Sequence, residues 1–373
     1  MKILIICRMS NDIEASFSHV WGNLKSVSSV TVVRGKTGLF HPKVHYVTFH
    51  YIVDKIPLLR SLLQLIYSFF LCISYNPDII CSVHMSPQGY YGYALSKIFR
   101  KPLVLHLVSE SYGGLLLRKY ASKQANLMER PFAYRSAMHA DIITTTGESS
   151  KKRLANVGIP SDRIYASPSV ISTSRYKYLN LPKTIDIITL TRLSWEKHLD
   201  VFLQVIKEIS ERRPIRAVIA GIGPEMANLK AMAKQLDITD QVEFLGWVPD
   251  ENLIHLLNSS SIFLLTSSTE GFPTTIAEAV CNGVNVISSD VGDISSFIKH
   301  GSNGFLVRPF NNVQKYVENA LLLLDNPDYS MEIRKNGLET CKCLLYSQRE
   351  SVFQSILHQL IAQAIKKFPR ARH

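Results

Sequence analysis

The amino-acid sequence predicts an α/β protein with two doubly wound, Rossmann-like domains, and three observations lead to this prediction. The chain has 373 residues, which is too many for one ordinary core and suits two domains of roughly 150–200 residues each. Hydrophobic residues make up 46% of the chain and charged residues 19%, as in a folded globular protein. Short apolar runs alternate with helix-length segments, a pattern typical of parallel sheets with helices on both faces.

Each half of the chain contributes its own set of buried strands. In the first half, the runs KILIIC, SVTVV, PDIICSV, KPLVLHLV and ADIITTT predict strands at 2–7, 29–33, 77–83, 101–108 and 140–146. In the second half, TIDIITLTR, IRAVIAG, VEFLGWV, SIFLLTS, VNVISSD and NGFLVRP predict strands at 184–192, 215–221, 242–248, 261–267, 284–290 and 303–309. We therefore expect one domain at 1–170, a linker at 171–184 and a second domain at 185–347.

Two helical segments differ from the rest. Residues 61–77 (SLLQLIYSFFLCISYNP) carry no charge but are shorter than the roughly 20 residues of a spanning helix. A buried or interfacial helix is expected there, with membrane insertion as a minor alternative, so contact of the segment 56–75 with a membrane stays open. Apolar pairs at 352/353, 356/357 and 360/361 predict an amphipathic helix at about 348–366. We expect it to pack back on the first domain, although its basic tail leaves a membrane helix as an alternative.

Positive charge is concentrated in the first half of the chain. Residues 1–170 hold 20 Lys/Arg and 9 Asp/Glu, net +11, whereas residues 171–373 hold 22 and 21, net +1. This asymmetry indicates an anionic partner for the first half, such as a membrane surface or an acidic acceptor, or else a generally basic surface. Nucleic acid is not expected as a partner, because no basic helix interleaved with aromatic residues is present.

Cysteine usage and the N-terminus indicate the compartment. The six cysteines are scattered (Cys7, Cys72, Cys81, Cys281, Cys341 and Cys343), and their spacing matches neither a zinc framework nor a disulfide pattern. We therefore expect a reducing compartment and no metal site. The apolar run Ile3–Cys7 is too short for a signal peptide. The expected location is the cytoplasm, with peripheral attachment to the inner face of the membrane as an extension of that prediction.

The segment SSTEGFPTTIAEAVCNGVNVISSD, at 267–290, predicts a ligand site. Glu270 follows a buried strand, where open α/β sheets bind ligands. Pro273 is expected as the first residue of a helix. The N–H groups near Thr274 and Thr275 would then face an anion such as phosphate. Glu278, about a turn further on, would line the same cleft and suits the hydroxyls of a ribose or sugar. Two solvated surface acids are the alternative interpretation.

Cations and glycines follow two other strands of the second half. Arg192 and Lys197, in TLTRLSWEK, could clamp a diphosphate and stabilise the charge that develops when it leaves. A surface arginine and an ordinary helix start would explain them equally in isolation. Gly221 and Gly223 form a lone G-x-G without the third glycine of a dinucleotide fingerprint. Since KILIIC is also followed by no glycine loop, a nicotinamide or flavin enzyme is not expected, nor any other cofactor.

Taken together, these motifs resemble the retaining glycosyltransferases of family 4. EGFPTTIAEA resembles the family's E-x7-E motif, TRLSWEK its G-R-L-x-x-E-K segment and AGIGPE its G-x-G-P. GWVPDENLIHLLNSSSIFLLTSS is similar to its base-binding strand and the residues that follow, and DVGDISSFIKHGSNGFLV to its glycine-rich ending. The resemblance spans residues 76–310, with five motifs in order, and implies the GT-B fold, in which two Rossmann-like domains face a central cleft.

The resemblance implies a role for each matching position. Arg192 and Lys197 would hold the diphosphate of a nucleotide sugar, and Glu270 would lie beside the donor sugar. The implied donor-binding residues are Gly223, Val248 at the base, Phe272, Pro273, Thr274 and Thr275 at the sugar and phosphate, and Glu278 at the ribose. A UDP- or GDP-sugar would serve as donor, and the reaction would proceed with retention and without metal.

The most serious departure from the family pattern lies in the first domain. The family's catalytic histidine ends the strand that KPLVLHLVSES resembles, and Val108 or Ser109 stands in its place. His106 is on the same strand face as Val108 and is a catalytic candidate, although a core histidine is an equal interpretation. Glu110 and His84 are candidates for the acceptor side, each with an ordinary loop residue as the alternative.

The sequence therefore predicts a glycosyltransferase of cell-surface polysaccharide or glycolipid synthesis, whose basic first domain holds a glycan or lipid-linked, anionic acceptor. Three alternatives remain: a nucleotide-sugar 2-epimerase of the same architecture, a catalytically inactive nucleotide-sugar-binding protein, and a nucleic-acid-binding protein, which the basic first half would suit but no reader motif supports.

Overall fold

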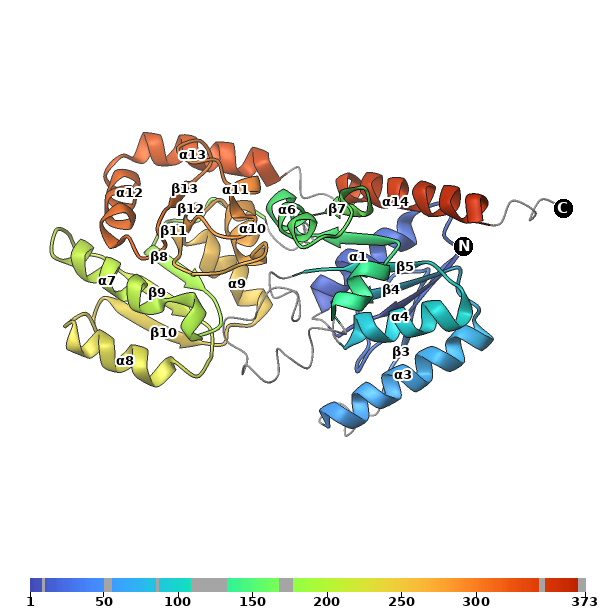
Figure 1. Cartoon of the computed structure of the whole chain (residues 1–373). Coiled ribbons are helices and arrows are strands. Elements are labelled where there is room, and N and C mark those ends of the chain that lie inside the picture. Colours follow the sequence, from blue (N-terminus) through green and yellow to red (C-terminus); the bar gives the residue numbers. More distant parts are fainter. Residues whose placement is uncertain are drawn as a thin grey trace. The chain divides into compact units, whose positions relative to one another are not determined.

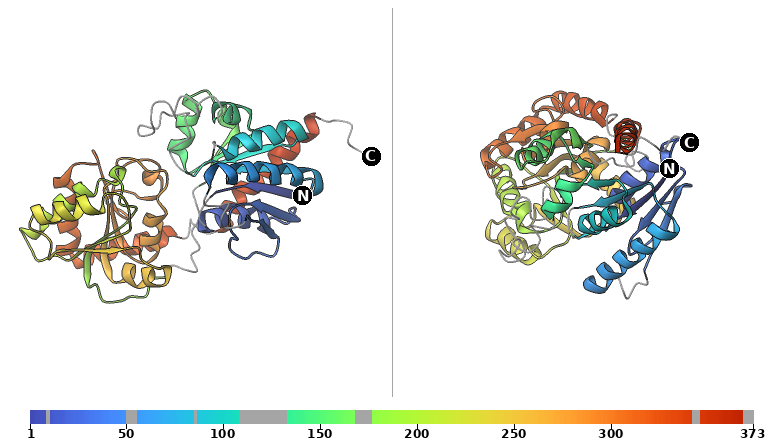
Figure 2. Two further views of the ribbon diagram at one scale, coloured as in Figure 1. Left: turned by 90° about the horizontal axis from the view of Figure 1, so that it is seen from below. Right: turned by 45° about the vertical axis from the view of Figure 1, so that its right-hand side comes forward.

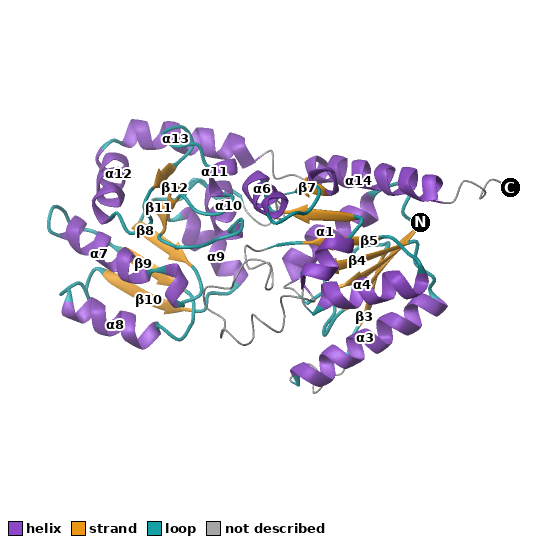
Figure 3. Cartoon of the chain, viewed as in Figure 1, coloured by secondary structure: helices purple, strands orange, loops and turns teal. Residues whose placement is uncertain are grey.

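A computed structural model describes residues 1–8, 11–49, 56–84, 87–108, 133–167, 177–341 and 346–367. The chain divides into two compact units (Figure 1). Unit 1 comprises Met1–Val170 and Tyr346–His373, and unit 2 comprises Ile171–Leu345. Both are built on a parallel sheet with helices on its two faces (Figure 3), which confirms the predicted fold class of two Rossmann-like domains.

Unit 1 contains a seven-stranded sheet in the order β3-β2-β1-β4-β5-β6-β7. The strands are β1 (Lys2–Ile6), β2 (Ser29–Val33), β3 (Val44–Val47), β4 (Ile79–Val83), β5 (Leu103–His106), β6 (Ile142–Thr145) and β7 (Ile164–Ala166). Its named helices are α1 (Asn11–Asn23), α3 (Pro57–Ser74), α4 (Gln88–Phe99), α6 (Glu148–Asn156), the 3-10 turn η1 (Ser161–Arg163) and α14 (Tyr346–Lys367). The central strands are buried on both faces, which explains their continuous apolar sequence.

The two faces of this sheet have separate cores. One core joins the sheet to α1 and to the apolar stripe of α14, which contributes Phe353, Ile356, Leu357 and Leu360. The C-terminal helix thus packs on the unit that contains the N-terminus. The other core joins the sheet to α3, α4 and α6. Figure 2 shows the helices on either side of the strands from two further directions.

Unit 2 contains a six-stranded sheet in the order β10-β9-β8-β11-β12-β13. The strands are β8 (Ile185–Leu190), β9 (Ala217–Ala220), β10 (Val242–Gly246), β11 (Ser260–Leu265), β12 (Asn285–Ser289) and β13 (Phe305–Val307). The helices are η2 (Trp195–Lys197), α7 (Leu199–Ser210), α8 (Met226–Gln235), α9 (Asp250–Asn258), α10 (Thr274–Cys281), α11 (Ile294–Phe297), α12 (Val313–Asp325) and α13 (Pro327–Thr340). The core on one face is lined by α7, α8 and α12, and the core on the other by α9, α10 and α11.

Two strands were not predicted from the sequence. β3 and β7 form the two edges of the unit 1 sheet, and they have only four and three residues. An edge strand needs no continuous apolar run because one side of it is open, and both strands are only partly buried. The pattern that identified the central strands is therefore missing at the edges.

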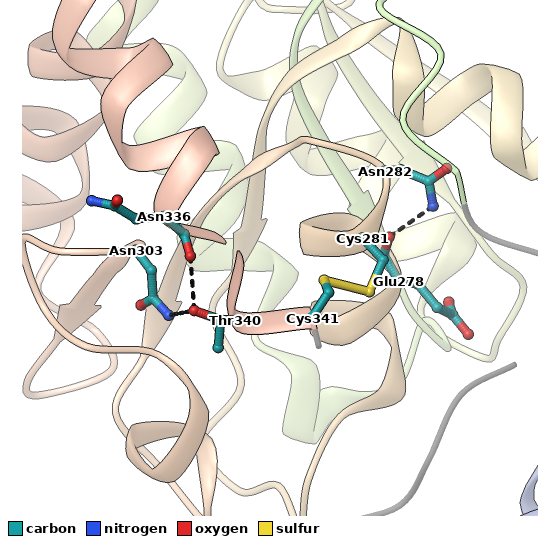
Figure 4. The surroundings of a disulfide bond; sticks show 7 residues. All are labelled: Glu278, Cys281, Asn282, Asn303, Asn336, Thr340 and Cys341. Atoms are coloured by element: carbon teal, nitrogen blue, oxygen red, sulfur yellow. Dashed lines mark hydrogen bonds between the residues drawn. A yellow bond between two sulfur atoms is a disulfide. The ribbon is translucent and has the colours of Figure 1, made fainter. Parts of the chain in front are cut away.

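The expectation that the cysteines form no disulfide is wrong. Cys281, the last residue of α10, is bonded to Cys341, directly after α13 (Figure 4). The two cysteines are 60 positions apart, and only the packing of α10 against α13 brings them together. Sequence spacing carries no signal for such a pair. Cys7, Cys72 and Cys81 are buried and form no disulfide with another described residue.

Candidate functional site

The candidate site lies at the point in the unit 2 sheet where the strand order reverses. From β8 the chain moves outward to β9 and β10, and it then returns to the other side of β8 to form β11, β12 and β13. The loops that follow β8 and β11 therefore leave neighbouring parallel strands at the same edge of the sheet. Open α/β sheets bind ligands at this reversal. Arg192 and Lys197 belong to the first loop, and Glu270 belongs to the second.

The structure brings Lys197 and Glu270 together. The ammonium of Lys197, at the end of η2, donates a hydrogen bond of 2.6 Å to Oε1 of Glu270. Their side chains are only 18% and 10% exposed. The hydroxyl of Ser267 donates a second bond of 2.6 Å to the same oxygen, and no bond to Oε2 is present within the described part of the chain. One carboxylate oxygen is thus fixed while the other is available to accept from a ligand.

Further hydrogen bonds join the two loops. The Thr266 hydroxyl donates to the carbonyls of Lys197 and His198 at 3.0 and 2.9 Å. The backbone N–H of Ser268 donates to the carbonyl of Glu196 at 3.0 Å. These contacts hold Lys197 and Glu270 next to each other, although the two residues are 73 positions apart in sequence.

Arg192 is held differently, on the surface. Its guanidinium donates to Oε1 of Glu196 at 2.7 Å, and the Ser194 hydroxyl donates to the same oxygen at 2.7 Å. Burial alone would raise the pKa of the Glu196 carboxyl, but the hydrogen bonds from Ser194 and Arg192 outweigh burial and lower this pKa below its ordinary value. Glu196 therefore stays ionised and orients Arg192, whose side chain is 70% exposed and accessible to a ligand.

The backbone beside Glu270 is fixed by a close approach of another loop. Gly292 has a φ of +63°, and a Cβ atom there would lie 2.1 Å from the carbonyl oxygen of Glu270. The next residue, Asp293, donates its N–H to the carbonyl of Gly271 at 2.9 Å. Only glycine fits at position 292, and the loop after β12 thereby supports the acid.

Helix α10 begins directly after this acid. It starts at Thr274 and not at Pro273, which occupies the extended position just before the helix, one residue from the prediction. No side chain caps the helix, so the N–H groups of Thr274 and Thr275 are not used by a capping side chain. Phe272 is buried and packs edge-on against Phe297 at 5.6 Å, which anchors the start of the helix.

Glu278 lies one turn into α10 and is partly exposed. Figure 4 shows its carboxylate directed away from the disulfide. It shares the helix whose first turn follows Glu270, so the loop-then-helix arrangement expected from the sequence is present.

The glycines after β9 serve close backbone packing. Gly221 has a φ of +144°, and a Cβ atom there would lie 1.8 Å from the carbonyl oxygen of Thr191. A Cβ atom on Gly223 would lie 2.1 Å from the carbonyl oxygen of Leu193. Both glycines therefore allow the loop after β9 to lie against the loop that carries Arg192. Val248, the residue predicted near the base, is partly buried two positions after β10.

His106 lies in the core of unit 1. Its side chain is fully buried, and its ring stacks on Phe353 of α14 at 5.4 Å. Trp21 donates its indole N–H to Nε2 at 3.2 Å, and because an indole can only donate, Nε2 must accept. The proton therefore sits on Nδ1, which bonds the Thr144 hydroxyl at 2.8 Å. Both nitrogens are occupied, which corresponds to the core interpretation and not to a catalytic base facing substrate.

Of the two residues predicted on the acceptor side, the structure describes His84 but not Glu110. His84 directly follows β4, which neighbours β1 at the reversal point of the unit 1 sheet. It is partly exposed and has a φ of +74°, so the chain turns sharply there. Glu110 lies outside the described residues.

Sequence reasoning missed the polar residues that orient the charged ones. Ser194, Thr266 and Ser267 lie inside the quoted motifs but were given no role in the prediction, and Glu196 was considered only as part of a helix start. A hydroxyl just after an apolar run, as in FLLTSS, was the available signal. It is weak because such residues also occur in ordinary turns.

The fold and the site together indicate the structural class of the protein. Two Rossmann-like units, with cations and carboxylates gathered at a strand reversal in the second, have the GT-B architecture. Residues 171–340 match the family model described as Glycosyl transferases group 1.

Individual relatives agree with the family. The chain is 30% identical over 156 residues to a phosphatidylinositol N-acetylglucosaminyltransferase subunit from Arabidopsis thaliana, over 41% of this chain and only 35% of that protein. It is 22% identical over 307 residues to the putative colanic acid biosynthesis glycosyltransferase WcaL of Salmonella typhimurium, over 78% of this chain and 71% of the relative. The crystal structure of Anabaena Alr3699/HepE in complex with UDP superposes with a TM-score of 0.75 at 19% identity, over 96% of this chain and 100% of that one.

None of the helices in the described residues has both the length and the apolar character needed to cross a bilayer.

Proposed function

We propose that the protein is a glycosyltransferase that moves a sugar from a nucleoside diphosphate sugar to a glycan or lipid-linked acceptor. The observation that carries this proposal is the Lys197–Glu270 pair, held at 2.6 Å at the strand reversal of unit 2 and next to the start of α10. The family match over residues 171–340 and the UDP complex of the structural neighbour HepE support it.

The donor would occupy the loops described above. The diphosphate would lie between the Lys197 ammonium, the Arg192 guanidinium and the first N–H groups of α10. The free oxygen of Glu270 would accept from hydroxyls of the sugar, and Glu278 would accept from the ribose. The backbone at Val248 would contact the base, and a UDP- or GDP-sugar is the expected donor.

The reaction we propose retains the configuration at the sugar. The bond between C1 and the diphosphate oxygen breaks, a bond from C1 to the acceptor oxygen forms on the same face, and the acceptor proton passes to the departing diphosphate. Lys197 and Arg192 would stabilise the negative charge on that leaving group. Because two fixed cations serve this purpose, we propose that the reaction needs neither a metal ion nor a cofactor.

The acceptor would be bound by unit 1. Residues 1–170 carry a net charge of +11, which suits an anionic acceptor such as a phosphorylated or lipid-linked glycan at the cytoplasmic face of a membrane. WcaL is named for polysaccharide synthesis and the Arabidopsis relative for a phosphatidylinositol substrate, which supports acceptors of these classes.

A screen of UDP-, GDP- and ADP-sugars by thermal shift tests the donor, because a bound ligand raises the unfolding temperature with its affinity. We expect one nucleotide class to bind, and Glu278→Ala to weaken that binding about 10- to 100-fold, or ~1.4–2.8 kcal/mol. Glu318→Ala, an exposed acid on α12, is the matched control. Wild-type affinity in the Glu278 variant would contradict the ribose role.

A product assay with EDTA then separates the possible activities. Transfer to an acceptor that EDTA does not affect supports the proposal. Release of free nucleoside diphosphate with interconversion of sugars, in the absence of acceptor, would identify an epimerase instead. Donor binding without turnover on any acceptor would identify an inactive binding protein.

A further inference from the structure

Helix α3 presents a continuous apolar face to solvent. Every exposed side chain from Leu59 to Ile73 is large and hydrophobic. These side chains are Leu59, Leu62, Ile66, Tyr67, Phe69, Phe70 and Ile73, with Phe70 63% and Ile73 59% exposed. Except for Tyr67, they recur every three or four positions and form one stripe along the helix.

Two polar residues in the middle of α3 lie on the opposite, inner face. Gln64 and Ser68 are buried. The Gln64 amide donates to the carbonyls of Cys7 and Val33, at 2.9 Å each, and accepts from the Gln88 amide at 3.2 Å. The inner face also packs Leu63, Leu65 and Leu71 on the core, as a usual surface helix does. The outward apolar face is therefore additional to the face that α3 packs on the sheet.

Basic groups gather at the C-terminal end of this face. Helix α4 lies beside α3 (Figures 1 and 2), and Phe69 contacts Phe99 of α4 edge-on at 5.3 Å. The last turn of α4 exposes Lys97 together with Ile98, and Arg100 follows in a left-handed cap. At the same end, the Lys2 ammonium donates to the carbonyl of Tyr75 at 3.2 Å.

Acidic groups are almost absent from this stretch. Between Ile56 and Leu107 the sequence has four basic residues and a single acid, Asp78. The Asp78 carboxylate is occupied, because it accepts from the backbone N–H of Lys2 at 2.7 Å. Lys97 and Arg100 are both exposed, so the apolar stripe is bordered by positive charge at this end.

We propose that the outer face of α3 is a membrane-docking surface that lies in the interface of an anionic lipid bilayer. Leu62, Phe70 and Ile73 would enter the boundary between headgroups and acyl chains, and Lys97 and Arg100 would contact acidic headgroups. Lipid is the better partner than a second copy of the chain, because a copy would bring the same cations while acidic lipid offers the opposite charge. The surface is separate from the sugar-transfer site of unit 2 and does not depend on the proposed reaction.

Co-sedimentation of the full chain with vesicles tests this proposal, without any nucleotide sugar. We expect binding to vesicles of equal parts phosphatidylcholine and phosphatidylglycerol, and weaker binding to phosphatidylcholine alone. The double variant Leu62→Ser/Phe70→Ser should lower the partition coefficient about tenfold or more. Leu322→Ser/Met331→Ser, which removes two exposed apolar side chains of unit 2, is the matched control and should bind like the wild type.

A charge variant separates the contribution of the basic residues to vesicle binding from that of the apolar stripe. Lys97→Gln/Arg100→Gln should weaken binding to the acidic vesicles and leave the residual binding to phosphatidylcholine unchanged. Salt at ~0.5 M, which shortens the Debye length to about 4 Å, should have the same effect as this variant. All variants replace exposed side chains, so their unfolding temperatures should remain within about 3 °C of the wild type.

Three results would overturn the proposal. They are an absence of binding to acidic vesicles, equal binding of wild type and the Leu62/Phe70 variant, or a wild-type dimer in solution that the same variant converts to a monomer. The last result would assign the face to a second copy of the chain. Sugar transfer is measured in an assay without vesicles. Intact transfer without vesicle binding would therefore contradict this inference alone, and vesicle binding without transfer would contradict the proposed function alone.

Discussion

The pair formed by Lys197 and Glu270 has a structural role, and the proposed function adds a chemical one. The two charges are mostly shielded from water, and Ser267 fixes one oxygen of the acid. Loss of either partner would leave the other charge poorly solvated, which is expensive in a partly buried site. The Lys197 ammonium has three N–H donors, so it can bind phosphate while it keeps its bond to Glu270. We therefore expect the pair to matter for stability in the free protein and for transfer in the donor complex.

We expect Lys197→Ala and Glu270→Ala each to lower kcat/KM for sugar transfer by ~10²–10³, because the leaving-group charge or the sugar contact is lost. Lys197→Ala should also lower the free energy of unfolding by about 1–3 kcal/mol, measured by urea denaturation. Lys207→Ala on α7 removes an exposed pair with Glu211 and should cost no more than ~0.5 kcal/mol. Near-normal transfer by either site variant would refute the assigned roles.

His106 makes the stability of unit 1 depend on pH. Burial lowers the pKa of His106 well below its ordinary value of 6.5, and the nearby Arg349 charge lowers it further. In the unfolded chain this residue takes up a proton near pH 6.5, whereas in the folded chain it stays neutral until the pH is much lower. Below about pH 6.5 the unfolded state therefore binds more protons, and the free energy of unfolding must fall as the pH decreases.

We expect His106→Gln to be less stable than the wild type at pH 7.5, since the contacts with Trp21 and Thr144 are altered, but to lose less stability between pH 7.5 and pH 5. Urea denaturation at several pH values measures both effects. His358→Gln, on the exposed side of α14, is the control and should leave the wild-type slope unchanged. A His106 variant with the wild-type slope would show that another group is responsible.

At the scale of elements, the disulfide joins the C-terminal ends of α10 and α13. The end of α13 is also held without it. The Asn303 amide donates to the Thr340 hydroxyl at 2.9 Å, and that hydroxyl donates to the carbonyl of Asn336 at 2.8 Å, as Figure 4 shows. Reduction should therefore lower the stability of unit 2 without detaching α13.

Closing a loop of 60 residues is expected to stabilise unit 2 by about 4 kcal/mol through the loss of unfolded-state entropy. We expect dithiothreitol to lower the free energy of unfolding of the wild type by about this amount. Cys281→Ser/Cys341→Ser should show the lower value with or without the reductant. Equal numbers of thiols titrated in denatured samples before and after reduction would contradict the bond.

At the scale of the whole molecule, both sheets follow one plan, in which the next two strands run outward from the first and the remainder continue on its other side. The central strands could be predicted from sequence because burial on both faces requires continuous apolar runs, as in Ile79–Val83 and Ser260–Leu265. The edge strands could not, since β3 and β7 are only partly buried. The position of Glu270 after β11 followed from strand prediction alone.

Other parts of the site depend on three-dimensional packing. The contact of Lys197 with Glu270 spans 73 positions, and no local pattern encodes it. The burial of His106 depends on α14, which returns from the far end of the chain to stack Phe353 on its ring. The pairing of Cys281 with Cys341 depends in the same way on α10 and α13. The sequence thus predicts which loops carry charged residues, and the packing of helices and strands determines which of those residues contact each other.

The inward hydrogen bonds of Gln64 have a consequence for how α3 can meet a bilayer. The Gln64 amide is bonded to the carbonyls of two neighbouring strand ends, at Cys7 and Val33. Pulling the helix away from the sheet would leave the buried Gln64 amide without these two acceptors, at about 1–3 kcal/mol. The helix is therefore held to the sheet by its polar side. It can rest flat on lipid with its stripe of leucine, isoleucine and phenylalanine, but it does so as a fixed part of the domain and not as a released anchor.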